Sequence, residues 1–295
     1  AGGAGQNNPS LVPAASSAVL VATPRSRGQG LGKVAFVELR HPQQASSPIT
    51  AAEASVMLLG DTQRFFDRNV PGAVTFTVER TAAHALPFSP CGREGQAEIA
   101  VRKALAIPTD VRVVMLTRYS GSSASRCTYT GIALMSPGNL PGYVLLNGTT
   151  ADEGGYRGFA QWQMRETLIH ELGHSFFLAH AERFACQGGA TPADSRSCSP
   201  RLRPGAHDVM GYWGSSDDPL LMHARWALGA AGTSELHHPA TRQGTGRLWE
   251  ESAWPGRTGE GWRGIKLEDR AGSYWLEYRD GRSLERDARA GWQPL

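Results

Sequence analysis

The segment His170-Glu171-Leu172-Gly173-His174, followed by His180, constrains this 295-residue chain more than any other part of it. Residues 159–177 place apolar side chains at helical spacing and contain no proline, which predicts a helix. His170 and His174 lie four residues apart, so both imidazoles leave one face of that helix and can bind a single ion. Glu171 is the next residue, and its carboxylate can reach a water on that ion without binding the ion itself.

The residue types in this segment suit hydrolysis of an amide. A zinc ion held by neutral imidazoles, with one position open, lowers the pKa of its bound water to about 7. A carboxylate beside that water can take its proton during attack on a carbonyl, and can then pass the proton to the leaving amine. The motif H-E-x-x-H is short, and a chance match on a buried helix is the alternative. His180 and the sequence Asp208-Val209-Met210-Gly211-Tyr212 therefore add weight to the metal-site interpretation.

With these features the chain resembles the metzincin metalloproteases, and within them the gametolysin-type peptidases. The motifs are HELGHSFFLAH at 170–180, DVMGY at 208–212 and WLEYR at 275–279. The resemblance implies a secreted zinc endopeptidase of mixed α/β (α+β) class. A twisted mixed sheet with the active-site helix would be followed by a smaller, irregular subdomain, with a cleft between the two.

The resemblance also implies a set of site residues. His170, His174 and His180 would bind one catalytic Zn²⁺, and Glu171 would be the general base and then the acid. Met210 would form a Met-turn below the metal, as a packing element and not a ligand. Tyr212 would donate a hydrogen bond to the developing oxyanion, with a plain buried tyrosine as the alternative.

One position departs from the family pattern. The glycine between the second and third histidines is Phe177 here. A continuing helix would carry His180 to the opposite face, so the chain must turn sharply after about Phe176. Glycine makes such a turn freely, whereas a left-handed Phe costs about 1–2 kcal/mol. The turn is strained, or forms by another route, or His180 is not the ligand and His207 replaces it.

Two other functions remain open at this point. A metzincin-like binding or adhesion module would keep the fold without activity, although the presence of Glu171 argues against it. A gluzincin-type protease would take its third ligand from a glutamate on a later helix. Glu182 and Glu235 are the candidates, and neither lies in a clear E-x-x-x-D pattern.

Composition excludes several classes of protein. An apolar content of 40% and a charged content of 19% fit a globular protein. The net charge of +3, without a Lys/Arg run, does not indicate nucleic-acid binding. No run of about 18 apolar residues exists, so no membrane span is expected. We expect a secreted protein whose export signal is missing from this chain. The expected partner is a protein or peptide substrate, with an extracellular glycoprotein as one option.

Four cysteines, an even number, fit two disulfides in an exported protein. Three pairings can be drawn. We favour Cys91 with Cys127 and Cys186 with Cys198, because each pair falls inside one expected subdomain. Structural zinc or free thiols are the alternative, although no C-x-x-C spacing supports a cluster. Calcium is left open, because no D-x-[DN]-x-[DN]-G loop supports it.

The pattern along the chain predicts four regions: a flexible tail at 1–30, a catalytic subdomain at 31–180, a subdomain with the Met-turn at 181–243, and a small β-rich module at 244–295. Thr50 is the expected N-cap of the first helix, with Glu53 completing a capping box. The side chains expected to face the sheet are Val56, Leu59, Phe65 and Phe66.

The sequence Asn147-Gly148-Thr149 is a glycosylation sequon or, more simply, a turn after a strand. The expected strands are 34–39, 74–78, 111–117 (central), 127–135, 142–146, 264–267 and 273–278, and the other expected helices are 94–106 and 220–228.

Overall fold

The computed structural model describes the chain in segments, and only the backbone is described at 157–160 and in the strands after residue 180. The segments are 32–42, 47–72, 74–118, 129–134, 142–148, 157–176, 178, 180, 183–186, 198–201, 209–211, 236–237, 264–269 and 272–276.

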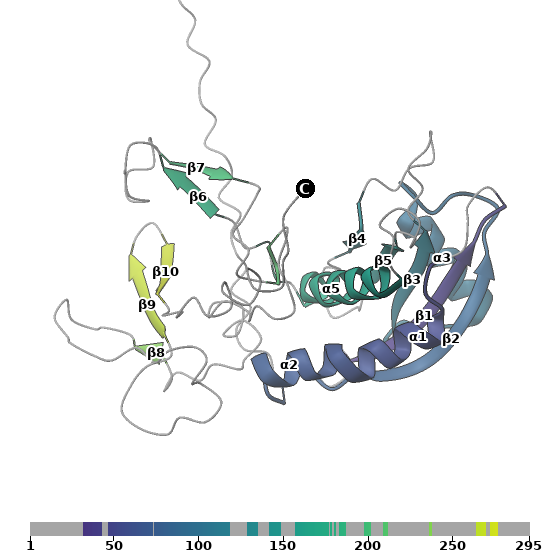
Figure 1. The fold of residues 1–295 in the computed structure, drawn as a ribbon, viewed down its shortest axis with the longest axis horizontal. Coiled ribbons are helices and arrows are strands. Elements are labelled where there is room, and N and C mark those ends of the chain that lie inside the picture. Colours follow the sequence, from purple (N-terminus) through teal and green to yellow (C-terminus); the bar gives the residue numbers. More distant parts are fainter. Residues whose placement is uncertain are drawn as a thin grey trace, which may run out of the picture.

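The described part of the chain is built on a five-stranded sheet in the order β2-β1-β3-β5-β4 (Figure 1). The first four strands in that order run parallel, and β4 runs antiparallel to β5. β3 is central and buried along its length, as its continuous apolar run predicted. The strand bounds are β1 Lys33–Arg40, β2 Thr77–Ala85, β3 Arg112–Arg118, β4 Gly131–Ala133 and β5 Tyr143–Gly148.

Helices cover both faces of this sheet. The chain crosses from β1 to β2 in one direction and from β2 to β3 in the other, which places the two connections on opposite faces when both are right-handed. One core cluster joins the first helix and α5 (Arg157–Ser175) to β1, β3 and β5. The other joins α3 (Glu94–Leu105) to the opposite face of the same strands. Helix α5 therefore shares its face of the sheet with the first helix, as Figure 1 shows.

The first helix runs continuously through α1 (Ala51–Met57), the π-helical turn η1 (Leu58–Thr62) and α2 (Gln63–Asn69). It begins at the predicted N-cap, with both hydrogen bonds of the capping box present. Phe65 and Phe66 are buried as expected, but the prediction for Val56 and Leu59 is wrong, because they are 72% and 51% exposed. The buried stripe runs instead through small residues and one leucine: Ala51, Ala54, Leu58 and Thr62.

Two further expectations need correction. The predicted strand 74–78 overlaps β2 only at its last two residues, because β2 begins at Thr77 and continues to Ala85 as a largely exposed edge strand. Asn147 lies inside β5 and not in a turn. Its side chain is 1% exposed, and its Nδ2 donates to the Tyr129 carbonyl at 2.9 Å. In the folded chain Asn147 is therefore closed to glycosylation.

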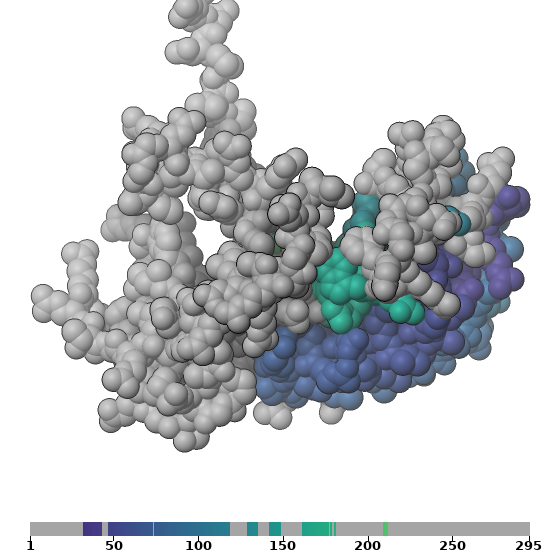
Figure 2. Space-filling model, viewed as in Figure 1, coloured from purple at the N-terminus to yellow at the C-terminus, as the bar shows by residue number. Residues whose placement is uncertain are grey.

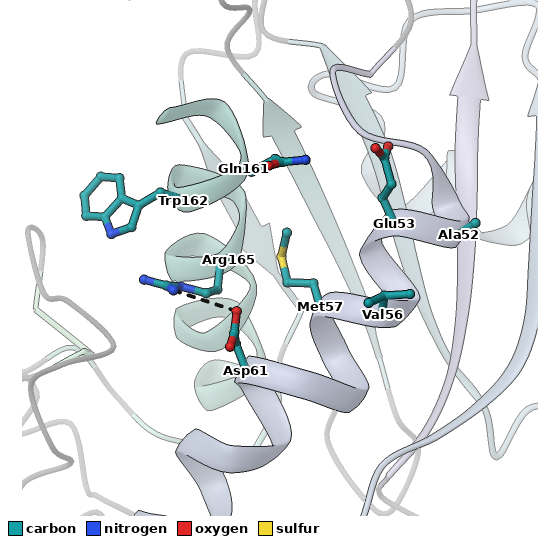
Figure 3. Close-up of a pocket in the computed structure, with 8 residues that line it drawn as sticks. All are labelled: Ala52, Glu53, Val56, Met57, Asp61, Gln161, Trp162 and Arg165. Carbon is teal, nitrogen blue, oxygen red and sulfur yellow. Dashed lines mark ion pairs between the residues drawn. The ribbon is translucent and has the colours of Figure 1, made fainter. Parts of the chain in front are cut away.

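A groove runs between α1 and the first half of α5 (Figure 3). Val56, Met57 and Trp162 line it, and Arg165 forms an ion pair with Asp61 at 3.8 Å across the two helices. In Figure 2 the surface of α5, in green-teal, lies next to that of α1–α2, in blue. None of the helices in the described ranges is long and apolar enough to cross a membrane.

The later strands form two separate groups. β6 (Arg183–Cys186) pairs antiparallel with β7 (Cys198–Arg201). β9 (Gly264–Asp269) pairs antiparallel with β10 (Gly272–Leu276), so the two expected strands near the end are present, and β8 (Leu236–His237) joins β9 in parallel. The helix expected at 220–228 lies outside the described residues. The fold is thus mixed α/β with a mostly parallel five-stranded sheet.

Candidate metal centre

Helix α5 presents two histidines on one side because another side packs into the core. Leu168 and Leu172 are fully buried against the sheet, with Ile169 beside them. His170 and His174 lie four residues apart on the adjoining, partly exposed side. The α5 backbone from Arg157 to Ser175 matches the predicted helix to within two residues at each end.

Three imidazoles converge at the end of α5. Nε2 of His174 lies 3.0 Å from Nε2 of His170 and 3.1 Å from Nε2 of His180. All three ligand atoms lie within 4.8 Å of one another. His170 and His174 are half-buried and His180 is exposed, so the cluster opens to solvent on one side. The structure therefore brings together the three histidines that the sequence predicted as metal ligands.

Backbone carbonyls fix the orientation of two of the rings. Nδ1 of His170 lies 2.7 Å from the Val209 carbonyl oxygen, and Nδ1 of His174 lies 2.7 Å from that of Leu178. A carbonyl oxygen can only accept, so both Nδ1 atoms must carry hydrogen. In a neutral ring the lone pair is then on Nε2, which is the atom that points into the cluster. Such outer hydrogen bonds orient histidine ligands in metal sites.

Burial keeps these rings neutral. Burial, with a smaller contribution from the neighbouring His174, lowers the pKa of His170 to about 4. Burial also lowers the pKa of His174, with the nearby His180 acting in the same direction. At neutral pH the two Nε2 atoms of the helix are therefore bare lone pairs, 3.0 Å apart. Two lone pairs at that distance repel each other unless a cation lies between them.

A sharp turn after helix α5, as expected from the sequence, brings His180 next to His174. The helix ends at Ser175, and the Leu178 N–H donates to the Gly173 carbonyl at 3.1 Å, which is the long hydrogen bond of a Schellman motif. His180 follows and contacts His174. Phe177 itself lies outside the described residues. So do the alternative ligands His207, Glu182 and Glu235.

The histidine spacing fits a tetrahedral zinc ion. With Zn–N bonds of about 2.0–2.1 Å, tetrahedral geometry separates two ligand nitrogens by about 3.3 Å. The two measured separations of 3.0 and 3.1 Å are close to that value. Three neutral imidazoles with an open side are also the donor set of catalytic zinc sites. These histidines can hold a metal ion, and their chemistry is compatible with zinc.

Glu171 is buried beside the histidines. Its side chain is 5% exposed, and burial raises its pKa to about 8, while a hydrogen bond from the Ala133 backbone acts in the opposite direction. The Oε2 atom has no hydrogen-bond partner within the described part of the chain. A buried, unsatisfied carboxylate oxygen is costly to stability, which makes it a candidate for function.

A glycine on β4 makes room for this carboxylate. A Cβ at Gly131 would lie 2.7 Å from Oε1 of Glu171 and 2.5 Å from Cγ2 of Thr167. Any other residue at this position would displace the glutamate. The strand β4 therefore supplies both an N–H, from Ala133, and the space that Glu171 occupies.

Met210 packs against helix α5 at Gly173. It is 1% exposed and lies in the turn Val209–Gly211. A Cβ at Gly173 would overlap with its Sδ atom and lie 3.1 Å from its Cε atom. The turn approaches α5 closely because Gly173 has no side chain, and this approach lets the Val209 carbonyl reach His170. Met210 is thus a packing element, as the sequence predicted.

The remaining predicted site residues are only partly described. Tyr212 and Cys127 lie outside the described residues. Cys91 is disulfide-bonded. Cys186 and Cys198 lie directly opposite each other in the β6–β7 register. Opposite residues of an antiparallel pair have a Cα separation of about 4.5–5.5 Å, which falls in the range that a disulfide requires.

The sequence analysis missed three residues that shape the site, Gly131, Ala133 and Gly173, and also Arg112, whose Nη2 lies 3.4 Å from the Ser175 carbonyl oxygen at the end of α5. A glycine inside a predicted helix costs about 1 kcal/mol relative to alanine, so Gly173 carried a readable signal of close packing. The other three act through contacts with distant parts of the chain, for which the sequence offered no local signal.

A comparison of the chain with models of known protein families found no match, and a comparison with curated proteins found none either.

Proposed function

We propose that this chain is an exported, zinc-dependent endopeptidase of the metzincin type. The observation that supports it most is the convergence of three Nε2 atoms beside buried Glu171, whose Oε2 has no hydrogen-bond partner among the described residues. The histidines alone would suit a structural metal, but a structural site needs no such carboxylate. The disulfide at Cys91 supports export, because disulfides persist in oxidising compartments.

His170, His174 and His180 would hold the ion. When bound, zinc polarises a substrate carbonyl and lowers the pKa of a water at its open position. Glu171, on the same helix, would accept the proton of the attacking water and return it to the leaving nitrogen. Its carboxyl accepts a backbone hydrogen bond from Ala133, and within the described part of the chain Oε2 is left for this task. From the resemblance alone, Tyr212 would assist at the developing oxyanion.

The edge of β4 offers a place for an extended peptide. The Leu134 N–H donates to Tyr143, and the Asn147 N–H donates to Thr130, so the intervening Gly131 and Ala133 turn their backbone groups away from β5. Ala133 donates from that outer edge to Glu171. A substrate strand added along this edge would therefore run beside the glutamate.

The proposal is tested with two glutamine variants on the same helix. Glu171→Gln is expected to reduce cleavage of an unfolded protein substrate by a factor on the order of 10²–10⁴. Glu166→Gln is the matched control, because Glu166 is similarly buried, at 7% exposure, but is paired with Arg165 at 2.6 Å. The control is expected to retain activity. Removing metal with a chelator should abolish cleavage, and zinc should restore it.

Two results would redirect the proposal. One equivalent of bound zinc, without cleavage of any peptide in a broad library, would favour a binding module that keeps the fold. A His180→Ala variant with undiminished zinc affinity would favour a glutamate as the third ligand, as in a gluzincin-type protease.

A further inference from the structure

A buried arginine lies under the end of the metal-binding helix. Arg112 begins β3 and is fully buried. Its Nη2 atom is 3.4 Å from the Ser175 carbonyl oxygen, and its Cζ atom is 5.0 Å from the centre of the Phe176 ring. Desolvation lowers the pKa of Arg112 to about 10, so the guanidinium remains charged at neutral pH. A buried charge is costly to place, so the position of this one calls for a reason.

One feature that Arg112 contacts is the end of α5. The last carbonyls of a helix lack partners within the helix and carry its negative partial charge, which a cation stabilises. The Phe176 ring gives the guanidinium a π face. On its other sides Phe176 packs against Phe66, with ring centres 5.5 Å apart, and Phe76, with ring centres 6.2 Å apart. Arg112 and these rings together hold the residue at which the chain leaves the helix.

The same turn orients two of the three metal ligands. The Phe176 N–H donates to the Leu172 carbonyl at 3.1 Å, and the turn then brings the Leu178 carbonyl to Nδ1 of His174. His180 lies two residues beyond Leu178. A displacement at Ser175 or Phe176 would therefore move His180 directly, and the ring of His174 through its hydrogen bond.

We propose that Arg112 is a positioning residue for the third metal ligand. Its guanidinium holds the Ser175 carbonyl and the Phe176 ring, and so fixes the turn that delivers His180. Within the local sequence the Leu178 to Gly173 hydrogen bond holds the turn, and Arg112 adds support from a distant strand. The inference rests on the metal centre of the proposed function, but not on peptide cleavage.

The test measures zinc affinity by competition with a chromophoric chelator, in the wild-type and His180→Ala backgrounds. Arg112→Met, which keeps the length but not the charge, is expected to weaken zinc binding by about 10- to 100-fold when His180 is present. In the His180→Ala background it should weaken binding by a clearly smaller factor, because the ligand it positions is gone and only the His174 hydrogen bond to Leu178 is left to disturb. Val113→Ala is the matched control. It alters the next residue of β3, which belongs to the core on the opposite face, and should leave the affinity within about threefold.

The proposal is overturned if Arg112→Met binds zinc as the wild type does, or if it weakens binding equally in both backgrounds, since either result leaves only a general structural role. If Arg112→Met does not fold, the zinc affinity of Arg112→Lys is measured in its place. That variant keeps the charge but loses the planar face, and an affinity unchanged from wild type would reject the proposal. A wild-type chain that binds no zinc would remove the proposed function as well, so the two failures are distinguishable.

Discussion

The two faces of the central sheet bury different kinds of side chain. The face under α3 packs apolar side chains, and its buried polar residues near the strand ends, Thr117 and Asn147, are neutral. The face under α1–α2 and α5 buries three ionisable residues, which are all the buried charged residues in the described ranges: Arg112, Glu166 and Glu171. One face is organised for stability, whereas the other accepts groups that stability alone would exclude.

Two glycines, one on α3 and one on α5, show the same contrast. Gly95 on α3 has open space around it, and a Cβ there would meet no atom within 4 Å. Gly173 on α5 has no room for a Cβ, because Met210 occupies the space. The buried ionisable residues and the crowded Gly173 therefore lie on the side of the sheet that α5 covers. This difference between the faces can be measured.

The largest expected effect on stability comes from Glu171. Burial raises its pKa from 4.5 to about 8, so the folded state favours the neutral carboxyl. The corresponding stability is fully present below pH 4.5 and is lost as pH rises through about 8. In metal-free protein, Glu171→Gln should therefore raise the free energy of unfolding at pH 9 by about 2–4 kcal/mol, and much less at pH 5. Chemical denaturation with chelator present at both pH values measures this.

The paired glutamate on the same helix provides the comparison. Glu166→Gln removes one partner of the ion pair with Arg165 and should lower stability by about 1 kcal/mol at both pH values. If Glu171→Gln changed the free energy of unfolding relative to the wild type by the same amount at pH 5 and pH 9, ionised Glu171 would not destabilise the folded state. At acidic pH a different residue controls stability. The pKa of His170 is lowered in the folded state, so the free energy of unfolding falls as pH drops from 6.5 towards 4.

A methyl group at Gly173 comes next in size. Gly173→Ala improves helix propensity, but its Cβ would overlap with the Met210 sulfur, so we expect a net loss of about 1–3 kcal/mol and weaker zinc binding. In a Met210→Ala background the same substitution should cost nothing or stabilise by up to about 1 kcal/mol. A double-mutant cycle of unfolding free energies tests this. Equal losses in both backgrounds would mean that the sulfur is not what excludes the side chain.

Local sequence signals predicted the elements whose causes are local. The helix that begins after Thr50 was placed by its capping box, and α3 was predicted from Glu94 up to the residues before Pro108. The spacing of His170 and His174 needed only helical geometry. The family resemblance placed His180 with them despite Phe177, and the long hydrogen bond from Leu178 to Gly173 accounts for the turn.

Contacts between distant segments were not predictable in the same way. The carboxylate of Glu171 depends on Ala133 and Gly131 of a short edge strand, and the end of α5 depends on Arg112, which is 63 residues away from Ser175. Val56 and Leu59 are exposed because the buried stripe of the first helix runs through Ala51, Ala54 and Leu58, and the large apolar residues alone do not reveal that helical phase.

The smallest expected change in the free energy of unfolding is on the α3 face. It tests whether glycine is required in the helices on both faces of the sheet or only on the α5 face. Gly95→Ala adds a methyl group into open space in the first turn of α3, where it reduces the entropy of the unfolded chain. We expect the free energy of unfolding to rise by about 0.5 kcal/mol, with zinc affinity unchanged. If this variant instead lost stability as Gly173→Ala is expected to, glycine would be required on both faces. The crowding at Gly173 would then reflect general packing and not the metal centre.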